Sequence, residues 1–167
     1  MASLFPEHRR QYLSIARRMG VIAARLLSGA PKDIRIVLRG PLFSAETENI
    51  HFELPYRYTP YTVSLLKGFL EVHLGPEVNY MSAALLAQDR SLSVEESRGD
   101  ARTYNNILEV TARSEKDSVS LSGTVTEENK LRIVSVNGYW IDFVPEGTLL
   151  RFSNHDRPGV IGRIGTL

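Results

Sequence analysis

Polar residues that could hold a small ligand cluster near the C-terminal end of the sequence, in residues 154–159, NHDRPG. They follow a strand-like stretch, 148–152, and precede an apolar pattern of helical spacing. A strand that passes into a helix through such a turn leaves backbone N–H groups free at the positive end of the helix. These groups could hold the carboxylate of a small molecule, with Asn154 and Asp156 contacting its polar groups. Asp156 could equally cap the helix and Pro158 begin it, so both interpretations stay open.

The motifs of common catalytic and nucleotide-binding sites are missing from the sequence. It contains no G-x-G-x-x-G, no G-x-x-x-x-G-K-[ST], no G-x-S-x-G and no H-E-x-x-H. The four histidines are scattered and offer no pair at i, i+3 or i+4 to bind a metal from one helix face. Glu95 and Glu96 would point to opposite faces of a strand, so they cannot act as a paired acid and base. We therefore expect neither a catalytic residue nor a metal site in this chain.

The size and charge of the chain restrict its class. Its 167 residues make one domain or slightly more, and they can bury enough surface to fold without a metal or a disulfide. A net charge of +1 predicts neither nucleic acid nor a membrane as the main partner, although a local basic pocket could still bind a small anion. The absence of cysteine excludes disulfides and thiolate metal sites. With no apolar run of about 20 residues and no signal-peptide pattern, we expect a cytoplasmic protein.

Three segments have the periodicity of amphipathic helices, namely residues 6–28, 60–75 and 82–89. The second helix carries Gly68 in its interior, where glycine costs about 1 kcal/mol relative to alanine. A close approach of this helix to a strand would explain that residue. Ser82 is the expected N-cap of the third helix.

Seven segments alternate between apolar and polar residues as strands do: 34–40, 49–54, 92–96, 107–113, 118–125, 131–136 and 139–143. Asn137 and Gly138 join the last two and are typical of the type I′ turn of a β-hairpin. The order is one helix, two strands, two helices and then a run of antiparallel strands. This order predicts an α+β fold, with a mixed or antiparallel sheet and helices packed on one of its faces.

A short break at residues 145–147, PEG, separates this unit from the end of the chain. We assign residues 1–145 to a first domain and residues 146–167 to the first strand and partial first helix of a second one. The apolar residues of that helix would have no sheet to pack on, and each would lose about 1.5–3 kcal/mol of burial. We expect the final residues to be frayed or to pack against a neighbouring chain.

Residues 154–167, NHDRPGVIGRIGTL, resemble the opening loop and helix of an ACT domain, a module that senses small molecules on enzymes of amino-acid biosynthesis. The segments before them resemble the intervening, or allosteric substrate-binding, domain of D-3-phosphoglycerate dehydrogenases. The matching segments keep the order of that family over almost the whole chain and are residues 12–29, 34–40, 65–71, 78–97, 121–125 and 131–150.

The resemblance implies a parent enzyme that oxidises 3-phosphoglycerate with NAD in the first step of serine synthesis. The catalytic and NAD-binding domains of that enzyme would precede this chain, which itself would hold no cofactor. The chain would be a regulatory and oligomerisation module, a homodimer or homotetramer. Regulation would be a shift in population between states that differ in affinity for a phosphorylated ligand or for serine.

The resemblance also implies binding residues. Asn154 and Asp156 match the ACT-loop positions that contact the amino-acid effector in serine-regulated relatives. Arg132 matches a basic position that can hold phosphorylated ligands in the intervening domain. Charge alone adds further candidates for an anion site, Lys130, Arg39 and Lys67.

Two other classes of function stay open. The beta subunit of iron–sulfur L-serine dehydratases pairs a related domain with an ACT domain, but its PSSSHT-type stretch is missing here. A free-standing ligand-binding or scaffold domain is the second alternative.

Two positions depart from the dehydrogenase pattern. Val144 stands where relatives can carry arginine, which weakens the anion pocket, and Ser82 stands where they usually have asparagine.

Overall fold

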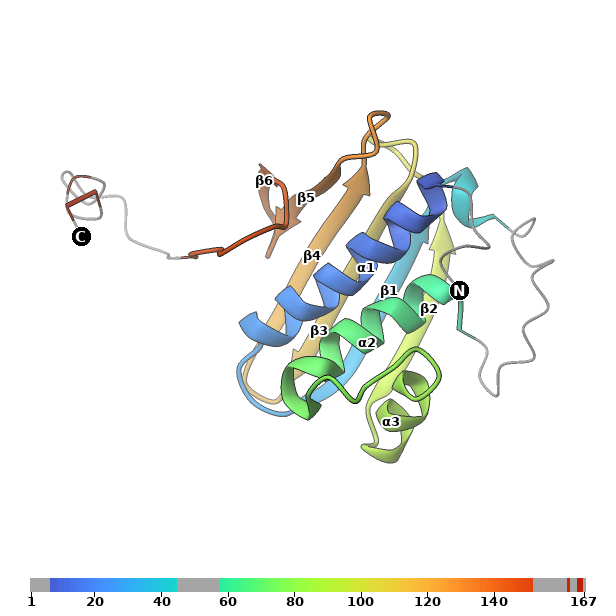
Figure 1. The fold of residues 1–167 in the computed structure, drawn as a ribbon, viewed down its shortest axis with the longest axis vertical. Coiled ribbons are helices and arrows are strands. Elements are labelled where there is room, and N and C mark those ends of the chain that lie inside the picture. Colours follow the sequence, from blue (N-terminus) through green and yellow to red (C-terminus); the bar gives the residue numbers. More distant parts are fainter. Residues whose placement is uncertain (1–6, 45–57, 152–161, 163–164, 167) are drawn as a thin grey trace.

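The computed structural model describes residues 7–44, 58–151, 162 and 165–166. These residues form an α+β unit in which helices accompany one mixed sheet of six strands, so the predicted fold class is confirmed. In Figure 1, helices α1 and α2 lie side by side across one face of the sheet, and α3 lies beside its β2 edge. Among the described residues no helix is both long and apolar enough to cross a membrane. The division at residue 145 into two domains stays a prediction.

The helices and strands occur where the sequence patterns place them, with ends shifted by a few residues. They are α1 (Glu7–Leu26), β1 (Pro31–Arg39), the 3-10 helix η2 (Pro41–Phe43), α2 (Pro60–Leu74), α3 (Ala83–Asp89), β2 (Ser93–Gly99), β3 (Ile107–Ser114), β4 (Ser118–Val125), β5 (Leu131–Val136) and β6 (Tyr139–Phe143). The predicted strand 49–54 lies outside the described residues.

The strands of the sheet are ordered β2-β1-β3-β4-β5-β6. β2 runs parallel to β1, and each of the other neighbouring pairs is antiparallel. A parallel pair requires a long crossover connection, and α2 and α3 lie in the connection from β1 to β2. The sheet therefore has β2 at one edge and the short strand β6 at the other.

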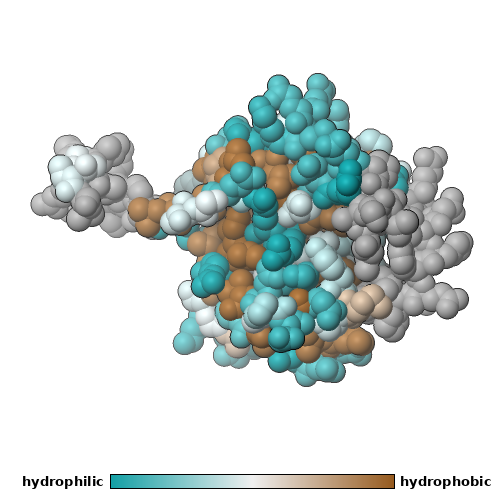
Figure 2. All heavy atoms as spheres, in the orientation of Figure 1, coloured by the Kyte–Doolittle hydropathy of each residue, from teal (hydrophilic) through white to brown (hydrophobic). Residues whose placement is uncertain are grey.

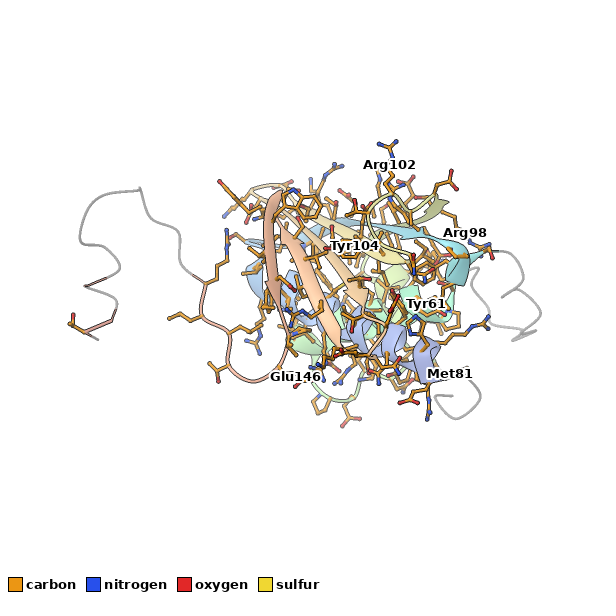
Figure 3. All side chains as sticks on the ribbon, turned by 90° about the horizontal axis from the view of Figure 1, so that it is seen from above. Tyr61, Met81, Arg98, Arg102, Tyr104 and Glu146 are labelled. Carbon is orange, nitrogen blue, oxygen red and sulfur yellow. The ribbon has the colours of Figure 1, made fainter. Side chains whose placement is uncertain are left out.

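The two faces of the sheet differ because successive strand residues point to opposite sides. On β1, Ile34, Ile36 and Leu38 are buried in the core, whereas Arg35 and Arg39 alternate with them on the other face. Figure 2 looks at the helix side, which is largely hydrophilic over the helices and hydrophobic toward the side where the C-terminal segment leaves. No helix of the described residues covers the opposite face, which points upward in Figure 3.

Helix α1 packs closely on the sheet because β4 carries a glycine beneath it. Ile15 and Met19 of α1 are fully buried. A Cβ on Gly123 of β4 would lie 2.6 Å from the sulfur of Met19 and 2.9 Å from the Cδ1 of Ile15. A side chain at position 123 would therefore require Met19 and Ile15, or the helix that carries them, to move.

The glycine inside α2 serves a helix–helix contact. A Cβ on Gly68 would lie 2.0 Å from the carbonyl oxygen of Arg17 in α1. The expected approach to a strand was wrong, because α2 meets α1 along its length and Gly68 lies at their crossing.

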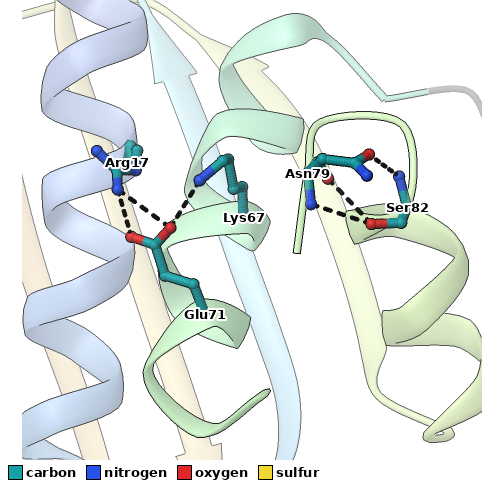
Figure 4. Close-up of polar contacts among 5 residues, drawn as sticks. All are labelled: Arg17, Lys67, Glu71, Asn79 and Ser82. Atoms are coloured by element: carbon teal, nitrogen blue, oxygen red, sulfur yellow. Dashed lines mark hydrogen bonds and ion pairs between the residues drawn. The ribbon is translucent and has the colours of Figure 1, made fainter. Parts of the chain in front are cut away.

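An ion-pair cluster spans the same two helices. Glu71 accepts from Lys67 and from Arg17, at 2.6 Å and 2.8 Å (Figure 4).

Asn79 and Ser82 together form the turn that begins α3. The side-chain oxygen of Asn79 accepts from the backbone N–H groups of Met81 and Ser82, each at 2.9 Å. The hydroxyl of Ser82 accepts from the N–H of Asn79 at 3.1 Å, as Figure 4 shows. Ser82 does occupy the N-cap position, as predicted, but its side chain bonds backward to Asn79 and makes no capping bond to the helix.

The hairpin of β5 and β6 has the predicted turn. Asn137 and Gly138 have φ angles of 50° and 80°, as a type I′ turn requires. The register of β5 shifts between Ile133 and Ser135, and the consecutive residues Ile133 and Val134 are both buried. The extra residue at this bulge shifts the alternation by one position. Ser135 therefore faces away from the helices, although Ile133, two residues before it, faces them.

Candidate functional site

An open hollow of about 470 Å³ lies on the helix-free face of the sheet. Five strands supply its floor, and the loop between β2 and β3, residues 100–106, supplies its wall. The floor includes one polar or aromatic side chain from each of these strands, Arg39, Glu109, Ser122, Ser135 and Trp140.

Strand register brings the floor residues together. Glu109 of β3 lies opposite Ser122 of β4, Ser122 lies opposite Ser135 of β5, and Ser135 lies opposite Trp140 of β6. Residues opposite each other on one face have Cβ atoms about 4.5–5.5 Å apart. One continuous row of side chains therefore crosses four strands, although its members come from distant parts of the sequence.

The wall of the hollow is fixed to the body of the domain at Asn106. The carbonyl oxygen of Asn106 accepts from the hydroxyls of Tyr12 and Thr124, at 2.9 Å and 2.7 Å. Its side-chain oxygen accepts from the N–H of Leu42 at 2.8 Å. These bonds hold the end of the wall at Asn106 against α1, β4 and the residues that follow β1.

Two guanidinium groups with different surroundings line the hollow. Arg39 donates from Nε to Glu109 at 2.9 Å. Room for its guanidinium comes from Gly99, where a Cβ would lie 2.6 Å from an Arg39 nitrogen. Arg102, on the wall, has no ion pair or hydrogen bond within the part of the chain that the structure describes. Figure 3 shows Arg102 on the upper, helix-free side of the sheet.

This set of groups suits a small anion that also has hydroxyl groups. Guanidinium groups bind carboxylates and phosphates through paired N–H donors. The hydroxyls of Ser122 and Ser135 can donate or accept, and Asp100 adds a carboxylate that can accept. Among the described residues there is no group of three His, Asp or Glu side chains that could hold a metal ion.

Arg132, the basic residue predicted from the family resemblance, lies outside the hollow. It donates from Nε to Asp142 of β6 at 2.6 Å. This hydrogen bond raises the pKa of Arg132 and lowers the pKa of Asp142. Arg132 shares the open face with Arg39, but three strand spacings separate them, roughly 14 Å.

The other two predicted basic residues are also paired and lie elsewhere. Lys130, in the turn from β4 to β5, contacts Glu128 at 2.6 Å. Lys67 lies on α2, on the helix side of the sheet, where it contacts Glu71 and the ring of Tyr80. Of the four predicted residues, only Arg39 therefore lines the hollow, and the structure does not bring the four together. Asn154 and Asp156 lie outside the described residues.

Sequence reasoning missed most of the hollow. Arg102 belongs to the stretch RGDART, residues 98–103, which has the composition of a polar turn, and Tyr104 follows it. Ser122 and Ser135 could have been noticed as the polar members of two alternating strands. Trp140 follows the Asn-Gly turn on a strand that the sequence does place, but its position beside Ser135 depends on the register.

Comparison with known proteins identifies a family. The family model described as the D-3-phosphoglycerate dehydrogenase intervening domain matches residues 9–137. D-3-phosphoglycerate dehydrogenase of Archaeoglobus fulgidus is 35% identical over 157 residues, which cover 93% of this chain and 28% of the relative. The enzyme of Methanocaldococcus jannaschii is 31% identical over 93% of this chain and 27% of the relative, and that of Bacillus subtilis 28% identical over 95% and 28%.

The chain thus spans less than a third of the length of these relatives. The family match includes α1, α2, α3 and the strands β1 to β5, which build most of the floor and all of the wall of the hollow. With a family match over residues 9–137 and relatives above 30% identity over nearly the whole chain, this protein belongs to the D-3-phosphoglycerate dehydrogenase intervening-domain family.

Proposed function

We propose that this chain is the regulatory and oligomerisation domain of an NAD-dependent D-3-phosphoglycerate dehydrogenase of serine biosynthesis, and that it binds a phosphorylated three-carbon acid in the hollow. The observation that carries the proposal is the guanidinium of Arg102, which has no ion pair among the described residues and lines the same hollow as Arg39. NAD would bind another part of the whole cytoplasmic enzyme. L-Serine would bind an ACT domain through Asn154 and Asp156.

The chemistry of the hollow fits such an acid better than it fits a simple inorganic anion. 3-Phosphoglycerate has a phosphate and a carboxylate, which the two guanidinium groups could each bind in part. It also has a hydroxyl, which could donate to Asp100 or to a serine of the floor. Sulfate has no hydroxyl donor and would leave Asp100 facing an anion. The volume of about 470 Å³ lies within the usual range for small-molecule sites.

Regulation would follow from the position of the wall. Arg102 lies in the loop between β2 and β3, whereas Arg39 lies on β1. A ligand that binds both residues would favour the arrangement in which loop and sheet are closest. Any neighbouring domain that contacts the loop would then respond to ligand through a shift in population.

A thermal-shift series tests the ligand directly, with 3-phosphoglycerate, 3-phosphohydroxypyruvate, L-serine and sulfate at matched ionic strength. A ligand at 100 times its Kd stabilises by about 2.7 kcal/mol, which raises Tm by roughly 5–11 °C for a chain of this size. We expect a rise with the phosphorylated acids and little or none with sulfate or serine.

Variants locate the site. Arg102→Gln should remove the rise, and Arg25→Gln should retain it, because Arg25 is an exposed arginine in the last turn of α1. A rise that survives Arg102→Gln but disappears in Arg132→Gln would move the ligand to the Arg132–Asp142 pair. No rise with any phosphorylated acid would contradict the proposed ligand.

A further inference from the structure

The edge strand β6 carries the largest exposed aromatic side chains in the described part of the chain. Tyr139 is 74% exposed and Trp140 72%, and Ile141 and Val144 beside them are 37% and 36% exposed. We call these four residues the β6 surface. Helix α1 lies over β3, β4 and β5, and no helix of the described residues lies over β6 (Figure 1). The strand therefore presents both side chains and backbone groups to solvent.

The opposite edge of the sheet is built differently. β2 has the sequence SVEESRG and carries Glu95, Glu96 and Arg98. Its Glu96 accepts from the N–H and the hydroxyl of Thr59, each at 2.9 Å, at the start of α2. Soluble proteins commonly protect edge strands with charge and with neighbouring elements, which prevents pairing with another chain. Among the residues that the structure describes, β2 has this protection and β6 lacks it.

The charge on β6 does not oppose pairing with a copy of itself. Asp142 is the one residue of the strand that is charged at neutral pH, and Arg132 pairs with it at 2.6 Å. In an antiparallel pair centred on Ile141, Trp140 would lie opposite Asp142 of the second copy, and Ile141 opposite Ile141. No two like charges would then meet, and the guanidinium of Arg132 would lie within reach of the indole ring of the other copy.

We propose that β6 pairs antiparallel with β6 of a second copy of this chain, about a two-fold axis at Ile141, which joins two six-stranded sheets into one of twelve strands. This interface supplies the surface for the oligomerisation role in the proposed function. It does not require the ligand. An isologous contact of this kind closes on itself and produces a dimer.

The area available predicts a weak dimer. If each aromatic side chain contributes about 200 Å² when fully exposed, Tyr139 and Trp140 supply roughly 300 Å² per copy, or roughly 600 Å² in a dimer. Ile141, Val144 and the strand backbone add to this, but the total stays near the lower end of the ~1,200–2,000 Å² of stable interfaces. We therefore expect dissociation of the dimer in the micromolar range of concentration.

The composition of the chain makes a direct test possible, because Trp140 is its only tryptophan and it contains no cysteine. Sedimentation velocity and tryptophan fluorescence are measured without ligand from about 1 µM to 1 mM, the range expected for an interface of low area. A dimer should form as concentration rises, with a blue shift of the emission. Ile141→Lys should remain folded by circular dichroism and stay monomeric. Met81→Lys changes an exposed apolar residue far from β6 in the sequence, so it is the matched control and should still form the dimer.

Oxidation of single-cysteine variants fixes the register. Ile141→Cys should give a disulfide-linked dimer, because opposed residues of an antiparallel pair have Cα atoms about 4.5–5.5 Å apart. Tyr139→Cys should not, because four residues along the strands would separate the two sulfur positions by roughly 13 Å. A monomer at every concentration would overturn the proposal, and so would a dimer abolished by Met81→Lys but not by Ile141→Lys.

The result of the dimerisation test can be distinguished from the result of the ligand test. Ile141→Lys should keep the rise in Tm with a phosphorylated acid if the proposed ligand is correct. Dimerisation without ligand would stand even if no acid binds.

Discussion

Gly20 of α1 and Gly68 of α2 each face the backbone of the other helix. A Cβ on Gly20 would lie 2.1 Å from the carbonyl oxygen of Leu65, and a Cβ on Gly68 would lie 2.0 Å from that of Arg17. Both distances are far inside van der Waals contact, so the two backbones touch only because neither residue has a side chain. This crossing holds α1 and α2 together over one face of the sheet.

Gly20→Ala or Gly68→Ala should therefore destabilise the domain. Alanine is favoured over glycine in a helix by about 1 kcal/mol, but here the new methyl group meets backbone that cannot rotate away. We expect the free energy of unfolding in urea to fall by at least about 2 kcal/mol for either variant. Ser14→Ala, an exposed position of α1, should change it by less than about 0.5 kcal/mol. Equal effects at positions 14 and 20 would contradict the close crossing.

Tyr12 and Tyr61 are both buried, but only the hydroxyl of Tyr12 is bonded within the described residues. It donates to the carbonyl of Asn106 at 2.9 Å and accepts from the N–H of Val125 at 3.2 Å. The hydroxyl of Tyr61 has no partner there, and burial raises its pKa to about 12.

Replacement of each tyrosine by phenylalanine should therefore give opposite results. Tyr12→Phe removes the partner of the buried N–H of Val125 and should lower the free energy of unfolding by about 1–3 kcal/mol. Tyr61→Phe removes a hydroxyl that gains nothing from burial and should be neutral or stabilising. Urea denaturation at pH 7 measures both, and a larger loss for Tyr61→Phe would show that its hydroxyl has a partner.

Glu71 should make stability depend on pH. Burial acts to raise its pKa, but hydrogen bonds from Lys67 and Arg17 lower it more, so the pKa of folded Glu71 lies below its ordinary value of 4.5. Because the folded pKa is the lower one, the carboxylate stabilises the fold fully above pH 4.5, and this contribution disappears as the pH falls through the folded pKa.

We expect Glu71→Gln to lower the free energy of unfolding by about 1 kcal/mol at pH 7, a modest value because Arg17 is half exposed. The difference from the natural chain should shrink as the pH falls below 4.5. Glu128→Gln is the control, because its pair with Lys130 is fully exposed and should contribute nothing measurable. A difference that grows at low pH would contradict the sign of the shift.

Gly99→Ala should disturb the hollow without disturbing the fold. The new methyl group would lie 2.6 Å from a guanidinium nitrogen of Arg39, the flexible end of a side chain, which can move aside. We expect a stability change within about 0.5 kcal/mol and a smaller rise in Tm with 3-phosphoglycerate. Ser93→Ala, on the same strand and away from the hollow, should leave that rise unchanged.

Local patterns in the sequence were sufficient to predict the helices and strands of the described fold. Alternation identified β3, β4 and β5, and helical spacing identified α1 and α2. The Asn137-Gly138 turn placed β6 beside β5, because a type I′ turn admits only a tight hairpin. The reason for Gly68 was misjudged, since periodicity shows which face of a helix is buried but not what lies against it.

The order of the strands and the contents of the hollow could not be read in this way. β1 lies between β2 and β3, so Arg39 meets Glu109 across 70 positions of sequence. Charge alone suggested Arg39, but the same criterion selected Lys67, which lies on the helix side.

The sequence by itself determined the class of fold, the position of the helices and strands and, through its ordered motifs, the family. These properties depend on interactions between residues close in the chain, or on the whole order of segments. The tertiary structure alone decided which side chains share the hollow and which edge is left unprotected. Those properties depend on strand order and register, which are set by the combined packing of the entire core and not by any short segment.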